Sequence, residues 1–250
     1  MKRFAAAWSS AALMSAALML ATAMVATTSA CAAGNQLQPY AAAGSAPAAA
    51  WHVAGLPQQQ KPFTKFSVVE VDGKRALRIE AVESYGNLVH TLQIEKATQK
   101  LSWRWRVELL NPAVNLRVKE GDDSALKVCA LWDLPLEQVP FVERQIMRIA
   151  RSKTAEPLPA ATVCYVWDAR LAEGTELDSA FTHRLRYVVL RSGDKPSQWF
   201  AEKRDIGADF LRLFGSESAT LPPLIGIAVG ADADNTHGRS VAYVADLVLE

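Results

Sequence analysis

Alternating apolar and polar positions dominate the chain from about residue 63 onwards. Short runs rich in β-branched and aromatic residues recur there, and turn signals such as DGK, YGN, RSGDKP and THGR separate them. The pattern predicts strands over residues 66–71, 76–82, 88–94, 101–109, 125–132, 162–168, 182–191, 198–203, 224–229 and 240–249. Because regular helices do not alternate with these strands, we expect an all-β fold, an antiparallel jelly-roll or lectin-like β-sandwich with two short helices.

The segment LSWRWRVEL, residues 101–109, shows the alternation most clearly. Side chains of a strand point alternately to its two faces, so Trp103 and Trp105 share one face and Arg104 and Arg106 share the other. Burial of two indoles stabilises a fold by roughly several kcal/mol. This favours a position in the core for the two tryptophans over a role as a platform for a ligand. The candidate binding residues of this strand are therefore the two arginines.

The strand predicted over 182–191 shows the same alternation, with Arg184 and Arg186 on one face. If this strand and 101–109 are neighbours in one sheet, four guanidinium groups line a single surface. Like charges at that spacing repel and need carboxylates or an anionic ligand between them. The alternative is a solvated face balanced by acidic residues such as Glu108 and Glu202.

Two segments carry a helical pattern. PFVERQIMRIARSK begins at Pro140 and places Val142, Ile146 and Ile149 on one side. RDIGADFLRLFG has Asp205 as a plausible N-cap and Gly215 as its C-terminal glycine. We expect both helices to pack their apolar sides on the sheets.

The N-terminus has the layout of a secretory signal peptide over residues 1–31, with a basic start, an apolar run and small residues before Cys31. This predicts an exported protein, periplasmic or secreted. The sequence TTSAC places Cys31 where a lipoprotein cysteine follows cleavage, although Thr28 stands where an aliphatic residue is usual. Lipidation at Cys31 would make the protein a membrane-anchored lipoprotein, and it is the one way in which we expect the chain to meet a membrane.

Residues 32–62 are rich in Ala, Pro and Gln, which predicts a flexible arm on which Trp51 and Val53 are placed to dock. Residues 63–250 have the size of a single β-sandwich domain. The whole chain has 27 basic and 26 acidic residues, so it lacks the basic footprint of a nucleic-acid-binding protein.

Two cysteines of the domain, Cys129 and Cys164, lie in the middle of predicted strands. In an oxidising compartment they could pair and close a loop, or each could be a small buried hydrophobic residue. Both alternatives agree with the sequence.

Standard catalytic signatures such as GxSxG, HExxH and the Walker glycine loop do not occur in the sequence. Two acidic turns are candidates for ligand binding: Asp122 and Asp123 lie before a strand, and Asp232, Asp234 and Asn235 follow another. The oxygen atoms of the second turn could coordinate calcium, but Asp and Asn also favour turns for backbone reasons. No other cofactor is indicated.

The strand-to-helix junction contributes Arg204 and Asp205 to the candidate ligand-binding residues. Residues of this kind at such a junction usually form a side-chain ion pair and a helix cap.

Several motifs occur in a fixed order: LSWRWRV, GDD before a strand, YVW, RSG, ExRD, FG and DADNT before the terminal AYVADLVL. In these motifs the chain closely resembles the exported bacterial proteins of domain-of-unknown-function family 3047, over residues 101–250. The resemblance implies an exported all-β domain, a jelly-roll or lectin-like sandwich, and supplies no activity. Positions of this sequence that match the motifs include Trp103, Arg104, Trp105, Arg106, Asp122, Asp123, Trp167, Trp199, Arg204, Asp205, Asp232, Asp234 and Asn235.

These observations favour a non-catalytic binding module of the cell envelope, whose partner is a glycan or another polar envelope component on the arginine-bearing sheet face. This hypothesis rests on analogy with other sandwich folds. One alternative is a polysaccharide-cleaving lyase or hydrolase that uses these arginines to neutralise a substrate carboxylate and Tyr187 or His183 for proton transfer. Another is a structural or assembly role.

Overall fold

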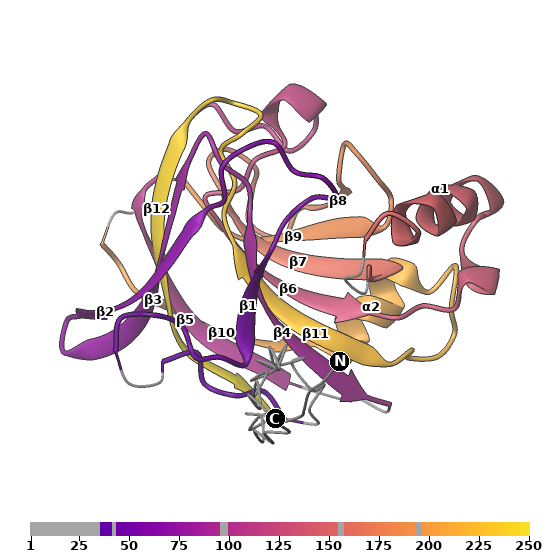
Figure 1. Ribbon diagram of the computed structural model, residues 1–250, viewed down its shortest axis with the longest axis horizontal. Helices are drawn as coiled ribbons and strands as arrows, with labels where there is room; N and C mark the ends of the chain where they lie inside the picture. Colours follow the sequence, from indigo (N-terminus) through magenta and orange to yellow (C-terminus); the bar gives the residue numbers. More distant parts are fainter. Residues whose placement is uncertain (1–35, 42–43, 96–99, 155–157, 194–196) are drawn as a thin grey trace, which may run out of the picture. The chain divides into compact units, whose positions relative to one another are not determined.

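Two β-sheets face each other in the computed structural model, which describes residues 36–41, 44–95, 100–154, 158–193 and 197–250 (Figure 1). The signal peptide predicted over 1–31 and the lipidation predicted at Cys31 lie outside these residues. The first sheet has seven strands in the order β1 (Trp51–Ala54), β4 (Asn87–Ile94), β11 (Leu224–Gly230), β6 (Leu126–Trp132), β7 (Ala161–Asp168), β9 (Leu185–Ser192) and β8 (Glu176–Asp178). The second has five strands in the order β10 (Phe200–Asp205), β5 (Lys100–Leu109), β12 (Arg239–Leu249), β3 (Lys74–Val82) and β2 (Lys65–Val71).

The predicted all-β sandwich with two helices is confirmed. Neighbouring strands pair antiparallel throughout the described sheets except for β7 and β9, which run parallel. This exception arises because the chain leaves β7, forms the short edge strand β8, and returns as β9 between the two.

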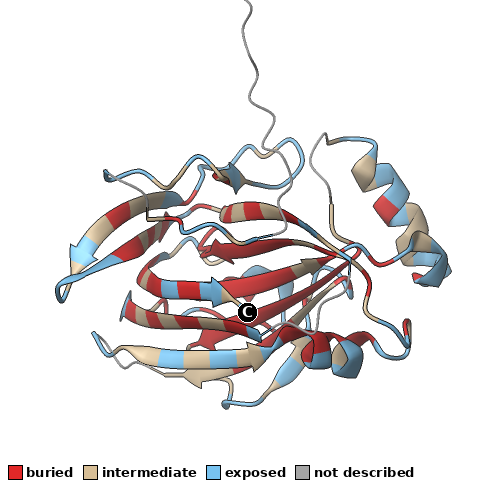
Figure 2. Ribbon diagram, turned by 90° about the horizontal axis from the view of Figure 1, so that it is seen from below, coloured by how far each residue is buried: buried red, intermediate tan, exposed pale blue. Residues whose placement is uncertain are grey.

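The core lies between the two sheets, and the tryptophans of β5 are part of it. Trp103 and Trp105 are 1% and 0% exposed, as the alternation predicted. Their rings contact those of Tyr165 and Trp167 on the facing strand β7, with centroids 5.4 and 5.9 Å apart. Figure 2 shows buried positions concentrated along the strand interiors. The conspicuous WRW segment is therefore a two-faced strand that joins the layers.

The condition under which four arginines would share one surface is not met, because the two strands are in different sheets. Arg104 and Arg106 belong to β5 in the five-stranded sheet. Arg184 directly precedes β9 and Arg186 lies within it, in the seven-stranded sheet. Alternation within a strand predicts which residues share its face, but it carries no information on which strands become neighbours.

Part of the segment predicted as a flexible arm belongs to the domain. Trp51 begins the edge strand β1, which pairs with β4, and its side chain is 5% exposed. Tyr40 is 4% exposed, and its hydroxyl donates to the carbonyl of Val244 at 2.7 Å. The prediction of an arm is corrected here, because two large aromatic rings outweigh the weak tendency of the surrounding Ala-rich sequence to fold.

The two helices behave differently. In α2 (Ile206–Phe214), Asp205 caps the first turn by accepting from the Ala208 amide at 2.9 Å, and Phe210 and Phe214 are fully buried, as predicted. In α1 (Phe141–Arg151), Met147 is the one buried residue. The prediction that α1 packs its apolar side on the sheet is wrong: Val142, Ile146 and Ile149 are 57–68% exposed. Neither helix, nor any other in the described part of the chain, is long and apolar enough to cross a membrane.

Candidate functional site

A pocket of about 370 Å³ opens on the face of the seven-stranded sheet that points away from the five-stranded sheet. Its floor consists of outward-facing side chains of β4, β6, β7 and β11, because alternate residues of these strands face the core. The polar or aromatic residues of this floor and its rim include Tyr85, Asn87, Thr91, Lys127 and Thr162. Strand β1 with the loop after it, Leu185 of β9, and the segments 153–154 and 158–159 complete the lining.

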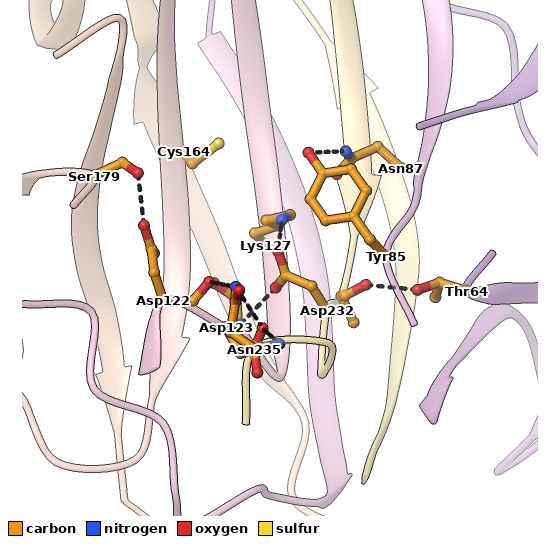
Figure 3. A network of polar contacts seen from close by, with 12 residues as sticks. Thr64, Tyr85, Asn87, Asp122, Asp123, Lys127, Cys164, Ser179, Asp232 and Asn235 are labelled. Atoms are coloured by element: carbon orange, nitrogen blue, oxygen red, sulfur yellow. Dashed lines mark hydrogen bonds and ion pairs between the residues drawn. The ribbon is translucent and has the colours of Figure 1, made fainter. Parts of the chain in front are cut away.

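Lys127 is a charged residue of the pocket floor. It is the second residue of β6, is 4% exposed, and its ammonium is 2.5 Å from Oδ2 of Asp232. The same ammonium is 5.1 Å from the centroid of the Tyr85 ring, a cation–π distance. Figure 3 shows the lysine between Asp232 and Tyr85. An ammonium has three donors, so this arrangement leaves donor capacity for a ligand oxygen.

Burial and charge act in opposite directions on the ion pair. Burial raises the pKa of Asp232 from 3.8 to about 6, although Lys127 and the Ser124 amide favour the ionised carboxylate. For Lys127, burial disfavours the charged form, but Asp232 outweighs that effect and the pKa is raised above 10.5. Both groups are therefore charged at pH 7.

The two acidic turns predicted from the sequence, at Asp122 and Asp123 and at Asp232 to Asn235, lie next to each other beside this ion pair. Asp122 accepts from the hydroxyls of Ser179 at 2.6 Å and Tyr187 at 2.9 Å, and burial together with this carboxylate raises the pKa of Tyr187 well above 10. Asp123 is fully buried and accepts from the backbone amides of Asn235 and Thr236. The two aspartates therefore anchor loops to the sheet, and neither lines the pocket.

The residues predicted to bind calcium do not form one cluster. Asp232 pairs with Lys127, Asp234 is 3.2 Å from the ammonium of Lys61, and the Asn235 amide donates to Asp123. Within the described residues, no group of three or more His, Cys, Asp or Glu side chains is arranged to hold a metal ion.

A disulfide joins Cys129 and Cys164 across the centre of the pocket floor. The residues are direct partners in the β6–β7 ladder, with Cα atoms 4.1 Å apart. The structure thus selects the pairing that the sequence had left open against two separate hydrophobic residues.

Arg104 and Arg106 lie on the outer face of the other sheet. The guanidinium of Arg106 is 3.0 Å from Asp72 and 2.6 Å from Glu108, and it lies over the rings of Trp199 and Tyr243. Its side chain is 12% exposed. Arg104 is more accessible at 31% and is 3.7 Å from a carboxylate oxygen of Asp246. Arg106 is thus bound within the protein itself, and this face forms no part of the pocket.

We expect Arg106→Gln to lower the free energy of unfolding by about 1–2 kcal/mol, because two ring contacts and two screened ion pairs are lost. Arg104→Gln is the matched control, with a smaller expected loss of about 0.5 kcal/mol, because it has one ring contact, 5.4 Å from the Trp199 centroid, and one long, exposed ion pair. Urea unfolding at pH 7 measures both. Equal losses in the two variants would contradict the internal role of Arg106.

Arg184 and Arg186 are also held by the protein. Arg184 is 5% exposed and makes ion pairs with Glu143 at 2.6 Å and Glu217 at 2.5 Å. Arg186 shares Glu217 at 2.7 Å and lies 4.0 Å from the centroid of the Phe214 ring. These contacts tie β9 to both helices.

Arg204 and Asp205 shape the junction that leads into α2. Arg204 makes a bidentate pair with Asp209, at 2.8 and 3.0 Å, which also accepts from the Tyr165 hydroxyl. Asp205 caps the helix. The pair and the cap expected at this junction are present, with Asp209 as the partner of the arginine.

The pocket residues were missed from the sequence. Lys127 gave the one usable signal, because a lone lysine within the apolar run ALKVCALW needs a buried partner. Tyr85, Asn87 and Thr162 gave no such signal, since isolated residues of these types are typical of any solvated face.

The fold and the pocket define an all-β sandwich with a polar site on the outer face of its larger sheet. The chain belongs to the family described as protein of unknown function (DUF3047), whose model matches residues 49–248, and this confirms the resemblance of the motifs.

Similar solved structures include three sandwich domains at low identity. The xyloglucanase domain of NopAA, a type three effector from Sinorhizobium fredii, is 11% identical with a TM-score of 0.42, over 83% of this chain and 95% of that one. Trichoderma harzianum Endoglucanase 3 from family GH12 is 9% identical with a TM-score of 0.42, over 80% and 90%. The catalytic domain of Humicola grisea Cel12A is 10% identical with a TM-score of 0.39, over 84% and 97%. No curated protein matches the chain.

Proposed function

We propose that this protein is a non-catalytic binding module of the cell envelope whose pocket takes a saccharide that carries a carboxylate or another anionic group. The observation that carries the proposal is the charge of the pocket. The lysines among its described lining residues are Lys127 and Lys153, and none of those residues is Asp or Glu. Asp232 neutralises the charge of Lys127, so the net positive charge of the pocket comes from Lys153. This charge favours a ligand with negative charge over a neutral or cationic one. Export through the predicted signal peptide is part of this proposal.

The remaining lining suits a polyhydroxylated ligand. Asn87, Thr91 and Thr162 offer amide and hydroxyl groups around the disulfide, and Tyr85 offers a ring beside the lysine. Saccharides are bound through such a mixture of hydrogen-bonding groups and apolar surface. The proposal moves the binding site from the arginine-bearing face to the pocket, because Arg106, Arg184 and Arg186 already have partners in the protein.

The same lining favours binding over cleavage. Glycoside hydrolases generally need two carboxyl groups on either side of the scissile bond, roughly 5–9.5 Å apart. The described lining residues supply none, and the nearby Asp232 is held by Lys127 and the Ser124 amide. The two groups considered for proton transfer are also badly placed: Tyr187 is 2% exposed and bonded to Asp122, and His183 pairs with Asp178 on the edge strand.

We expect Lys153→Glu to weaken binding to a uronic-acid polysaccharide such as polygalacturonate by about tenfold, since a favourable charge becomes a repulsive one. Lys153 is exposed, so the fold should be unaffected. Isothermal titration calorimetry at low salt, compared with a neutral glucan, measures the change.

Lys65→Glu is the matched control, because it reverses an exposed lysine on β2, outside the pocket. It should leave the affinity unchanged. Failure of the wild-type protein to bind any acidic saccharide would overturn the proposed function. Release of new reducing ends or unsaturated products during the incubation would replace it with the enzymatic alternative.

A further inference from the structure

Helix α1 packs with its polar side towards the rest of the protein and exposes its apolar side to solvent. Met147, its one buried residue, is flanked on the inner side by polar groups. Glu143 pairs with Arg184 at 2.6 Å, and Arg151 pairs with Asp133 at 3.0 Å and donates to the Leu158 carbonyl. The helix is therefore attached mainly through ion pairs and hydrogen bonds, whereas surface helices usually bury their apolar side.

The outward side is an apolar ridge. Phe141, Val142, Ile146 and Ile149 are 67%, 68%, 60% and 57% exposed. Val142, Ile146 and Ile149 follow the spacing i, i+4, i+7, which places them within an arc of about 60° on a helix of 3.6 residues per turn. Phe141 lies beside this row, about 100° from Val142 around the helix axis. Figures 1 and 2 show α1 at the margin of the sandwich, beyond the end of the seven-stranded sheet.

The charges around the ridge are positive. Arg148 and Lys153 are exposed, and neither Arg144 nor Arg148 forms an ion pair among the described residues. The one carboxylate of the helix, Glu143, is turned inwards to Arg184. A short helix with aromatic and aliphatic side chains on one side and arginines beside them is typical of helices that lie in the interface of a membrane.

We propose that α1 docks this protein on an anionic lipid surface, with the apolar ridge inserted at the level of the headgroups. The shape favours a membrane over a protein partner. The ridge is one row of three aliphatic side chains with Phe141 beside it on a convex helix, whereas a standard protein interface covers ~800 Å² on each partner. Shallow insertion needs no matching groove, and the arginines can extend to lipid phosphates while their stems lie along the apolar phase.

The test is sedimentation of the full chain with sucrose-loaded vesicles of phosphatidylglycerol and phosphatidylcholine, compared with vesicles of phosphatidylcholine alone. We expect the double variant Ile146→Gln/Ile149→Gln to bind the anionic vesicles at least about tenfold more weakly, because two inserted aliphatic side chains are lost. Arg148→Gln should weaken binding about fivefold, and only to anionic vesicles. The matched control is Val248→Gln, which removes an aliphatic side chain that is 49% exposed from β12.

All these positions are exposed, so the variants should unfold at the same urea concentration as the wild type, and the N-terminal leader is common to every protein compared. Equal vesicle binding by the wild type and the double variant would overturn the proposal. It would also be overturned if the wild type bound no vesicles, or if it dimerised through the ridge and the double variant became monomeric.

Discussion

Lys127→Met is expected to lower the free energy of unfolding by about 3–5 kcal/mol at pH 7, because it leaves the buried Asp232 carboxylate without its counter-ion. The methionine retains most of the volume of the lysine stem, so little of the loss comes from packing. The aspartate would keep the Ser124 amide as a donor at 2.6 Å, but one hydrogen bond does not compensate a buried charge. Urea unfolding followed by tryptophan fluorescence measures the change.

The pH dependence of that loss tests its cause. In the native wild type the pKa of Asp232 is about 6, above the value for an unfolded chain, so this group stabilises the fold increasingly as pH falls through 6 towards 4. Without Lys127 the native pKa rises further, and the carboxylate takes up its proton at a higher pH. The difference between wild type and variant should therefore be smaller at pH 5 than at pH 7.

The double variant Lys127→Met/Asp232→Asn is the control for charge. It removes both charges and keeps an oxygen that can accept from the Ser124 amide. We expect it to be more stable than Lys127→Met alone, since removal of both partners of a buried pair costs less than removal of one. A double variant no more stable than the single one would show that the loss comes from packing.

The sequence predicted the strands and the core well because these depend on local alternation. The period of two in LSWRWRVEL determines which side chains can face inwards, and burial of Trp103 and Trp105 then follows from their size. The capped helix α2 was equally predictable, because Asp205 and the following apolar residues act within one segment. Which strands become neighbours was not predictable, since this depends on contacts between distant segments. The sequence could therefore not decide whether the four arginines share one surface, and the structure separates them between the two sheets.

The candidate site was predictable only in fragments. GDD and DADN were identified as separate turns, but their convergence on Lys127 requires β6 and β11 to be adjacent. Once they are adjacent, Asp122, Asp123 and Asp232 become partners of protein groups, and the pocket above them is lined by other residues. The sequence predicted correctly that the apolar residues of α1 share one side of the helix, but it did not predict that this side faces solvent. The spacing of apolar residues shows that they share a side, and what that side meets depends on the partners of Glu143 and Arg151.

Replacement of both disulfide cysteines, Cys129→Ala/Cys164→Ala, is expected to lower the free energy of unfolding by about 4 kcal/mol. The bond joins residues 35 apart, and its main effect is to restrict the unfolded chain by closing that loop. The folded state should change little, because β6 and β7 are central strands whose ladder pairs these positions directly in any case. Urea unfolding of the oxidised wild type and the double variant measures the difference.

If the disulfide acts by restricting the unfolded chain, its removal should also change the dependence of the free energy of unfolding on urea concentration. The unfolded double variant is more expanded than the cross-linked chain, so the denaturant slope should increase together with the loss of stability. A reductant should move the wild type to the stability of the variant and leave the variant itself unchanged. A loss below about 1 kcal/mol, or a reductant effect of equal size on both proteins, would mean that this disulfide does not restrain the unfolded chain. Because the loop it closes contains α1 and part of the pocket rim, the same bond connects the stability of the sheet to both proposed binding surfaces.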